Sequence, residues 1–256
     1  MTDAGPPLEL LAQRAELLRA VRDDPSRKPE LADELAVSRS TVDRAVRQLE
    51  ASGLVTRAGG SVSLTLKGRL ALDSYETFAA HLAGLNAADA AIEPLPNDAR
   101  VAPVLFRDAT VVEATAVAPQ RPTEAYRSLV ADATHVRGYA SRLLDSTVPT
   151  LRDRIVDEGL ELDLVFDPDV LDAVLGGHGD AVADALDTGR LTLRQTDDGL
   201  VYSLMVLDTP TSTYACALFY DDSGHAGLLY NDDPDAVEWA DGVYESLRED
   251  ADTLSP

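Results

Sequence analysis

The stretch from residue 29 to residue 66 constrains the fold of this chain more than any other part of its sequence. Residues 29–36 have the pattern of a short helix, with a proline in the first turn and two leucines on one side. A second helix is predicted over Arg39–Ser52, because its apolar residues recur at helical spacing and Ser38 is a favourable N-cap. Gly53 is expected to end that helix in the left-handed conformation.

The residues after Gly53 predict a β-hairpin. Leu54–Arg57 and Ser61–Leu66 alternate apolar and polar side chains on either side of Ala58-Gly59-Gly60, a sequence that favours a tight turn. Upstream, residues 7–22 place apolar side chains on one helical face. The resulting order of helix, helix, turn, helix and hairpin is that of a winged helix-turn-helix.

The charged residues are unevenly distributed along the 256-residue chain, which carries 22 basic and 45 acidic residues. Residues 1–75 contain 11 of each sign, whereas residues 76–256 contain 11 arginines, 34 acidic residues and no lysine. The second part therefore holds the whole formal charge of −23. A neutral N-terminal part in so acidic a chain indicates that this part has a polyanionic partner.

The types of charged residue indicate adaptation to molar salt. Aspartate outnumbers glutamate 31 to 14, and arginine outnumbers lysine 20 to 2. Repulsion between carboxylates is screened within about 3 Å at 1 M salt, so such a surface is tolerated there. The sequence predicts a halophilic protein. The single Cys216, the lack of a long apolar run and the lack of an export signal at Met1–Pro7 predict a cytoplasmic location without membrane contact.

The exposed side of the helix predicted over Arg39–Ser52 carries residue types that contact DNA. Its small hydroxyls can approach phosphates or base edges, and its arginines can bond phosphate or guanine. Further basic residues at the hairpin are expected to contact the backbone. The predicted contacts to double-stranded DNA are Arg39, Ser40, Thr41, Arg44, Arg47, Arg57, Lys67 and Arg69. Asp43 would repel phosphate unless it orients an arginine or accepts from cytosine. The alternative is an adaptor that uses the winged helix for protein contacts only.

A long amphipathic helix is predicted over residues 67–93. Its apolar stripe has heptad-like spacing and comprises Ala71, Tyr75, Phe78, Leu82 and Leu85. The stripe predicts either a homodimer seam through Tyr75, Phe78, Leu82 and Leu85 or a helix packed on its own domains. Residues 93–98 contain two prolines and form the best linker. The expected domains are 1–66 (winged helix), 67–95 (linker or dimerisation helix) and 96–256.

The remainder alternates between helix and strand patterns. A hairpin is predicted from Val101–Phe106 and Thr110–Val117. Helices are predicted at Thr123–Ala131, Val148–Glu158, Pro168–Leu175, from the Gly176–Gly179 loop to Asp187, and Pro234–Arg248. Strands are predicted at Val136–Ala140, Leu160–Phe166, Leu191–Arg194, Leu200–Leu207, Thr213–Tyr220 and Gly227–Tyr230. This order predicts an α/β (or α+β) domain with a mixed sheet.

No pattern in the sequence indicates an enzyme or a metal site. The four histidines lack partners at metal-ligand spacing, and neither a nucleophile elbow nor a phosphate-binding loop is present. The acidic pairs Asp197-Asp198, Asp221-Asp222 and Asp232-Asp233 lie at predicted turns, where aspartate is locally favoured. The sequence therefore predicts no catalytic residue, no metal and no cofactor.

One arginine of the acidic part is a candidate for binding a small anion. Arg142 follows a predicted strand, at the end of the sheet where α/β domains commonly bind ligands. The predicted ligand-binding residues are Ser141, Arg142, Ser146, Thr147 and Arg121, and Arg107 could add positive charge. The expected ligand is a small anionic metabolite of the sugar phosphate class. The alternative is a salt bridge from Arg142 to Asp145, Asp167 or Asp169.

Three stretches, Val37–Leu66, Leu143–Leu175 and Asn231–Leu247, resemble archaeal winged-helix transcriptional regulators with a FilR-type middle domain. Within the last, Ala236-Val237-Glu238-Trp239 matches the family's habit of opening the closing helix with an acidic residue and tryptophan. The resemblance implies a dimeric, haloarchaeal DNA-binding regulator whose C-terminal domain is similar to a half-unit of the phospholipase D type. That family's His-x-Lys-x4-Asp motif is absent, which leaves a sensing or dimerisation role.

Overall fold

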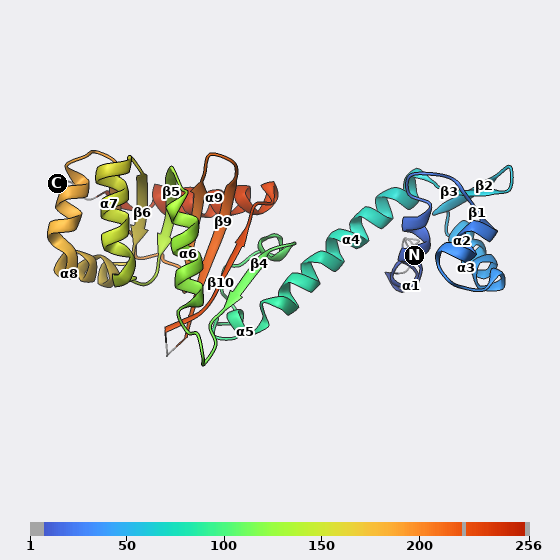
Figure 1. Cartoon of the computed structure of the whole chain (residues 1–256), viewed down its shortest axis with the longest axis horizontal. Coiled ribbons are helices and arrows are strands. Elements are labelled where there is room, and N and C mark those ends of the chain that lie inside the picture. Colours follow the sequence, from blue (N-terminus) through green and yellow to red (C-terminus); the bar gives the residue numbers. More distant parts are fainter. Residues whose placement is uncertain (1–7, 222–223, 254–256) are drawn as a thin grey trace. The chain divides into compact units, whose positions relative to one another are not determined.

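The computed structural model describes residues 8–221 and 224–253, except for the side chain of His225. The described residues do not include Met1–Pro7, for which the sequence predicts no export signal. They also do not include Asp222 of the acidic pair Asp221-Asp222. The chain divides into two compact units, Met1–Ala80 and His81–Pro256 (Figure 1).

The N-terminal unit is a winged helix, as the sequence predicts. It contains α1 (Leu8–Ala20), β1 (Ser26–Arg27), α2 (Lys28–Glu34), α3 (Arg39–Ala51), β2 (Val55–Ala58), β3 (Ser61–Leu64) and the first part of α4 (Leu66–Ala87). Ser38 caps α3, because its hydroxyl oxygen accepts from the Thr41 N–H at 3.1 Å. Gly59 and Gly60 both have positive φ and close a two-residue turn between β2 and β3.

Strand β1 was not predicted. It is two residues long and pairs antiparallel with β3, giving the sheet order β1-β3-β2. Nothing in its own two residues marks a strand, so the pairing depends on the position of β3, which comes later in the chain. The core of this unit includes Leu18, Leu31, Val46, Leu49 and Leu54, all of them fully buried.

The C-terminal unit is built on a mixed eight-stranded sheet in the order β11-β7-β6-β5-β8-β9-β10-β4. Strands β5, β6 and β7 are parallel, and the other neighbours are antiparallel. The strands are β4 (Thr110–Glu113), β5 (His135–Ala140), β6 (Glu161–Phe166), β7 (Leu191–Gln195), β8 (Ser203–Asp208), β9 (Thr213–Asp221), β10 (Gly224–Asn231) and β11 (Asp252–Thr253). The predicted mixed sheet is confirmed.

Helices cover both faces of this sheet and bury two apolar cores (Figure 1). One face packs against α6 (Arg121–Ala131), α7 (Val148–Glu158) and α8 (Pro168–Leu186). The other packs against α9 (Pro234–Glu249), the short α5 (Asp89–Ile92) and the 3₁₀ turn η1 (Pro103–Phe106). A second 3₁₀ turn, η2 (Asp145–Thr147), precedes α7.

Three sequence predictions are corrected by the structure. Val101–Phe106 is not a strand: Pro103 opens η1, and β4 pairs instead with β10. The long helix ends at Ala87, and α5 follows separately. The predicted loop at Gly176–Gly179 is a kink instead: two helical segments of α8 meet at His178, where φ is −136°.

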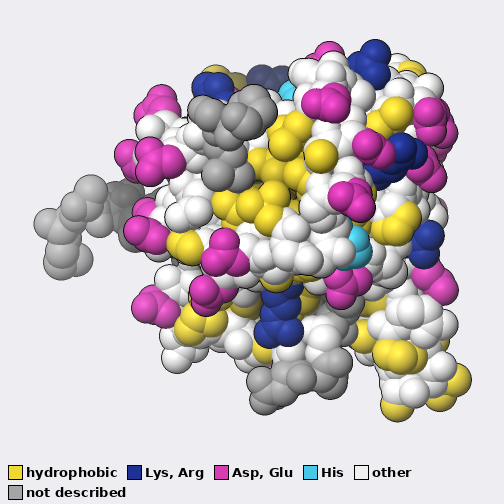
Figure 2. All heavy atoms as spheres, turned by 90° about the vertical axis from the view of Figure 1, so that its left-hand side faces the viewer, with side chains coloured by type: hydrophobic (Ala, Val, Ile, Leu, Met, Phe, Trp, Pro, Cys, Tyr) yellow, Lys and Arg dark blue, Asp and Glu magenta, His cyan; other side chains and the backbone are white. Residues whose placement is uncertain are grey.

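The surface of the C-terminal unit reflects its composition. On the face shown in Figure 2, Asp and Glu side chains surround an area where hydrophobic side chains reach the surface. Few Lys or Arg side chains are visible there. The negative electrostatic field of such a surface repels anions in solution.

Candidate functional site

The N-terminal unit presents the predicted DNA contacts on its surface. Arg39, Ser40, Thr41, Arg44, Arg47, Arg57, Lys67 and Arg69 are all exposed. Helix α3 buries Val42, Ala45, Val46 and Leu49 and therefore turns its arginines outward. Within the described part of the chain, no hydrogen bond or ion pair engages the guanidinium groups of Arg39 and Arg44. These two groups can bind an external anion without breaking an existing contact.

The acidic residue on the same helix is neutralised from a neighbouring element. Asp43 pairs with Lys28 at the start of α2. The hydrogen bond from Lys28 holds the pKa of the Asp43 carboxyl below its ordinary value. Arg47 donates through Nε to the main-chain oxygen of Asp43 at 3.2 Å, which leaves its Nη atoms exposed. The carboxylate that would repel phosphate is thus matched by a lysine.

The remaining predicted contacts differ in how far they are already engaged. Arg57 forms a two-point ion pair with Glu50, with its Nε 2.9 Å from the carboxylate. Lys67 donates to the main-chain oxygen of Ser52 at 3.0 Å. The Arg69 side chain has no hydrogen-bond or ion-pair partner among residues 8–221 and 224–253. Arg57 would have to leave Glu50 before it could bind phosphate.

The apolar stripe on α4 is divided between packing and exposure. Tyr75 packs against the core of the N-terminal unit, and Leu85 packs against a core of the C-terminal unit. Those two positions agree with a helix packed on its own domains. Phe78 and Leu82 are each 45% exposed, and they are the two members of the predicted dimer seam that remain accessible to a second copy.

The predicted anion-binding residues do not converge on one point. Arg142 lies over the ring of Tyr220, at 5.1 Å, and donates to the main-chain oxygen of Asp221 at 3.2 Å. The alternative salt bridge from Arg142 to Asp145, Asp167 or Asp169 is not formed among the described residues. Asp167 accepts from Tyr139 at 2.6 Å, and Asp145 contacts His178 at 2.8 Å.

The hydroxyls near Arg142 are mostly engaged. Thr147 is buried and donates to the main-chain oxygen of Leu144 at 2.8 Å. The Ser141 N–H donates to Ser203 Oγ at 3.0 Å. Ser146 is exposed. Arg121, at the start of α6, is also exposed. Arg107 is held by Asp233 and Asp235 and adds no positive charge to this region.

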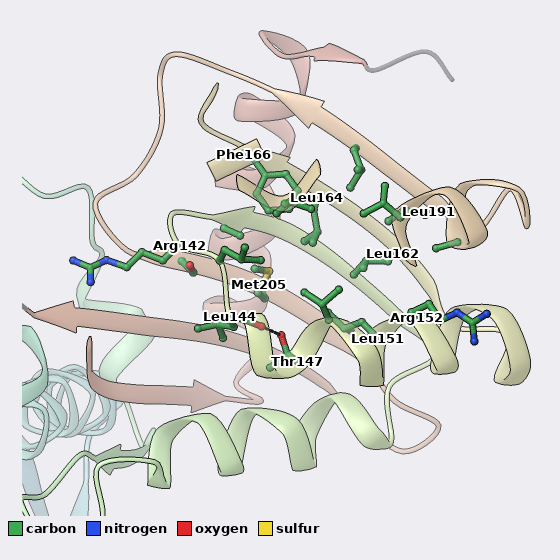
Figure 3. Close-up of a pocket in the computed structure, with 18 of the residues that line it drawn as sticks. Arg142, Leu144, Thr147, Leu151, Arg152, Leu162, Leu164, Phe166, Leu191 and Met205 are labelled. Atoms are coloured by element: carbon green, nitrogen blue, oxygen red, sulfur yellow. Dashed lines mark hydrogen bonds between the residues drawn. The ribbon is translucent and has the colours of Figure 1, made fainter. Parts of the chain in front are cut away.

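An apolar cavity of about 90 Å³ lies between the sheet and helices α7 and α8 (Figure 3). Its walls are mostly apolar and include Leu144, Leu151, Leu162, Leu164, Val182 and Met205. Figure 3 shows Arg142 and Arg152 at opposite ends, with their guanidinium groups directed away from it. This cavity could not be predicted from the sequence, because its walls come from helices and strands far apart in the chain.

Two further features limit the chemistry of the described residues. No group of three or more His, Cys, Asp or Glu among residues 8–221 and 224–253 is placed to hold a metal ion. Cys216 is buried, and burial raises the pKa of its thiol, which disfavours the reactive thiolate.

Among residues 8–221 and 224–253, no helix is long and apolar enough to cross a membrane.

Two family models match the chain. Residues 119–250 match the middle domain of the methanogenesis regulatory protein FilR1, and residues 7–84 match the HVO_A0261 N-terminal domain. The first match confirms the resemblance to regulators with a FilR-type middle domain. The comparison with curated proteins gives no significant match.

Several solved structures are similar at low identity. TrmBL2, an archaeal chromatin protein described with a novel mode of DNA binding, is 16% identical, with a TM-score of 0.45, over 96% of this chain and 98% of that one. The phospholipase D family member Nuc from Salmonella typhimurium is 10% identical, with a TM-score of 0.44, over 58% of this chain and 99% of that one. NucT from Helicobacter pylori is 11% identical, with a TM-score of 0.41, over 57% and 98%.

Proposed function

Because this chain belongs to the family defined by the middle domain of the methanogenesis regulatory protein FilR1, we propose that it is a transcriptional regulator that binds double-stranded DNA through α3. The observation that carries the proposal is the outward face of α3. There, Arg39 and Arg44 are exposed and have no partner among the described residues. Arginines placed this way in a winged helix can reach both phosphates and guanine edges in the major groove.

The charge distribution supports the same proposal. Residues 1–75 have no net charge, whereas residues 76–256 carry −23. In a chain so depleted of bases, the cations kept on α3 offset part of the cost of approaching a polyanion. The two carboxylates of α3 are offset by ion pairs, Asp43 with Lys28 and Glu50 with Arg57.

Replacing Arg44 and Arg47 with alanine tests this proposal. Each substitution is expected to weaken operator binding by about 1–3 kcal/mol without unfolding the unit, because both side chains are exposed. Binding is measured by fluorescence anisotropy at several stated KCl concentrations, since salt removes the electrostatic part of the affinity. The control is Arg127→Ala, which removes the same charge from an exposed position on α6. Unchanged binding by the double variant would favour the adaptor function instead.

We further propose that the regulator is a homodimer joined through α4. Phe78 and Leu82 lie one helical turn apart and are exposed, and two large apolar side chains at such spacing can pack against a second copy. Replacing both with glutamate is expected to turn a dimer into a folded monomer in light scattering at molar KCl. Leu66→Glu with Leu70→Glu, a similarly exposed pair at the same spacing, is the control. A wild-type monomer would exclude this seam.

A third part of the proposal concerns the C-terminal unit, which we expect to bind a small effector. The packing of α7 and α8 on the sheet leaves an apolar cavity, the kind of site in which small molecules commonly bind. The composition of the chain further supports a halophilic host.

A further inference from the structure

We propose that the cavity between α7, α8 and the sheet binds a small uncharged apolar molecule, an aromatic or alkyl compound of about the size of benzene. The site itself is independent of DNA binding, and only its role as an effector site depends on the proposed function.

The walls of the cavity favour an apolar ligand. Leu162, Leu164 and Leu191 line it from the sheet, while Leu151 and Val182 line it from the helices. A sugar would leave its hydroxyl groups without partners against such walls, and each unpaired hydroxyl is costly. Apolar ligands incur no such cost, and cavities lined by leucine, isoleucine and phenylalanine bind benzene or xenon.

Most polar groups at the cavity already have partners, whereas the Tyr126 hydroxyl, which also lines it, has none among the described residues. Ser203 and Tyr220 share a buried hydrogen bond of 2.8 Å between their hydroxyl oxygens. Thr147 donates to Leu144, as described above. The guanidinium of Arg152 is held by Asp153 and Asp184. The site therefore offers little to a charged or richly hydroxylated ligand.

The field of the unit selects in the same direction. With a charge of −23 over residues 76–256, the surface repels a dianion such as a sugar phosphate before it can reach the cavity. An uncharged molecule is not repelled. High salt also strengthens the burial of apolar groups when the salt is a kosmotropic one, which favours the same class of ligand.

Helix α8 is the wall that can give way to admit the ligand. The cavity of about 90 Å³ is smaller than the ~150 Å³ cavities that bind benzene, so entry requires some widening. The break at His178 lies between Val174 and Val182, both of which line the cavity. A Cβ built at Gly176, Gly177 or Gly179 would meet nothing within 4 Å, so packing does not require these glycines. They leave the helix conformationally adaptable beside the cavity.

Methionine labelling gives a direct test, because the chain has two methionines and one of them, Met205, lines the cavity. Benzene is titrated into the full-length protein, ¹³C-labelled at the methionine methyl groups, in molar KCl. The Met205 signal is expected to shift saturably while the Met1 signal serves as the reference. The melting temperature is expected to rise by roughly 3 °C at ten times Kd. Glucose 6-phosphate is expected to change neither quantity.

A matched pair of variants locates the site. Ala181 lines the cavity, and Ala181→Leu is expected to abolish both responses to benzene. Ala183→Leu makes the same change at an exposed position two residues along α8 and is expected to keep both. If Ala181→Leu fails to fold, the benzene titration of the wild type, followed at Met205, tests the proposal by itself. An unshifted Met205 signal, or a melting temperature raised by glucose 6-phosphate rather than benzene, would overturn the proposal. Neither readout involves DNA, so a failure here is distinct from a failure to bind an operator.

Discussion

Gly68→Ala is expected to lower the free energy of unfolding of the N-terminal unit by more than about 3 kcal/mol. Gly68 lies in the first turn of α4, and a Cβ there would stand 1.8 Å from the main-chain oxygen of Leu54. That oxygen also accepts from the Thr65 N–H at 3.0 Å, so the contact is fixed from both sides. Main-chain atoms cannot rotate away as a flexible side chain can, and even milder overpacking costs about 1–3 kcal/mol. The start of α4 would have to move away from Leu54, which directly precedes the β2–β3 hairpin.

Hydrogen exchange measured peptide by peptide distinguishes the two units in this experiment. Amides of α3 and β3 should lose protection in Gly68→Ala. The fluorescence of Trp239, the single tryptophan, reports on the C-terminal unit and should not change. Gly242→Ala is the matched control, because Gly242 is also helical and a Cβ there meets nothing within 4 Å. It should stabilise by about 0.5–1 kcal/mol. Wild-type protection in Gly68→Ala would contradict the packing argument.

The winged helix could be predicted from sequence because its determinants are local. Ser38 caps α3 with its own side chain, and Gly59 and Gly60 form the turn with their own backbone. Propensity and periodicity suffice for such features. The Lys28–Asp43 pair could not be predicted in the same way, since it joins residues on two helices whose packing must be known first.

Predictions for the C-terminal unit succeed or fail for the same reason. Val148–Glu158 is a helix with the predicted bounds, because proline at its start and Gly159 at its end mark it locally. Residues 101–106 are apolar enough for a strand, yet β4 pairs with β10, more than a hundred residues away. Arg142 was placed correctly after β5, but its stacking on Tyr220 depends on β9. Contacts across the sheet decide the site, and no local pattern encodes them.

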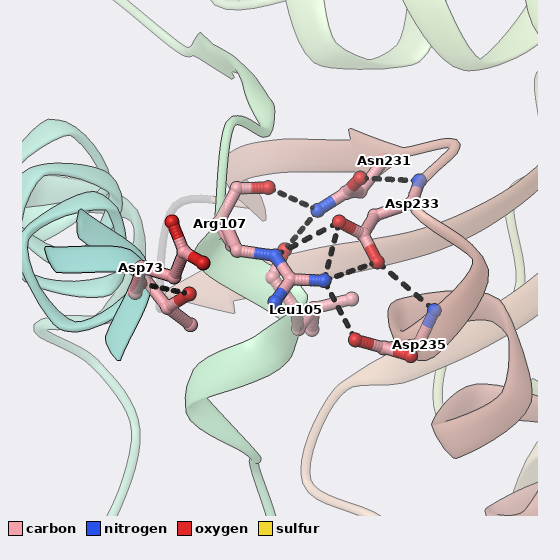
Figure 4. A network of polar contacts seen from close by, with 7 residues as sticks. Asp73, Leu105, Arg107, Asn231, Asp233 and Asp235 are labelled. Carbon is pink, nitrogen blue, oxygen red and sulfur yellow. Dashed lines mark hydrogen bonds and ion pairs between the residues drawn. The ribbon is translucent and has the colours of Figure 1, made fainter. Parts of the chain in front are cut away.

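Asp233→Ala is expected to destabilise the C-terminal unit by about 3 kcal/mol near neutral pH. Asp233 accepts from Arg107 Nε at 2.8 Å and from Nη2 at 2.6 Å, and both side chains are about one-fifth exposed (20% and 19%) (Figure 4). It also caps α9 by accepting from the Asp235 N–H at 2.9 Å. The substitution therefore removes a charge-assisted pair and a helix cap together, which contribute about 1.5–3 and 0.5–2 kcal/mol.

A neighbouring aspartate provides the control for this prediction. Asp235 pairs with the same guanidinium at 2.8 Å but is 67% exposed. Asp235→Ala makes the same change of charge and should cost less than about 1 kcal/mol, as exposed ion pairs do. Equal losses for the two variants would mean that net charge, and not the partly buried pair, determines the effect. Denaturant unfolding followed by Trp239 fluorescence measures both, since Trp239 lies on the helix that Asp233 caps.

The contribution of Asp233 should depend on pH in a defined direction. Burial alone would raise the pKa of Asp233, but hydrogen bonds from Arg107 and from the N–H groups of Asp235 and Ala236 outweigh it and lower the pKa. The unfolded chain therefore binds a proton at higher pH than the folded one. The stabilisation is complete above the unfolded pKa of about 3.9 and is lost as the pH falls through the lower folded value. The stability difference between wild type and Asp233→Asn should shrink across that acid range. A difference that stays constant from neutral pH through that range would show that Asp233 acts there by shape alone.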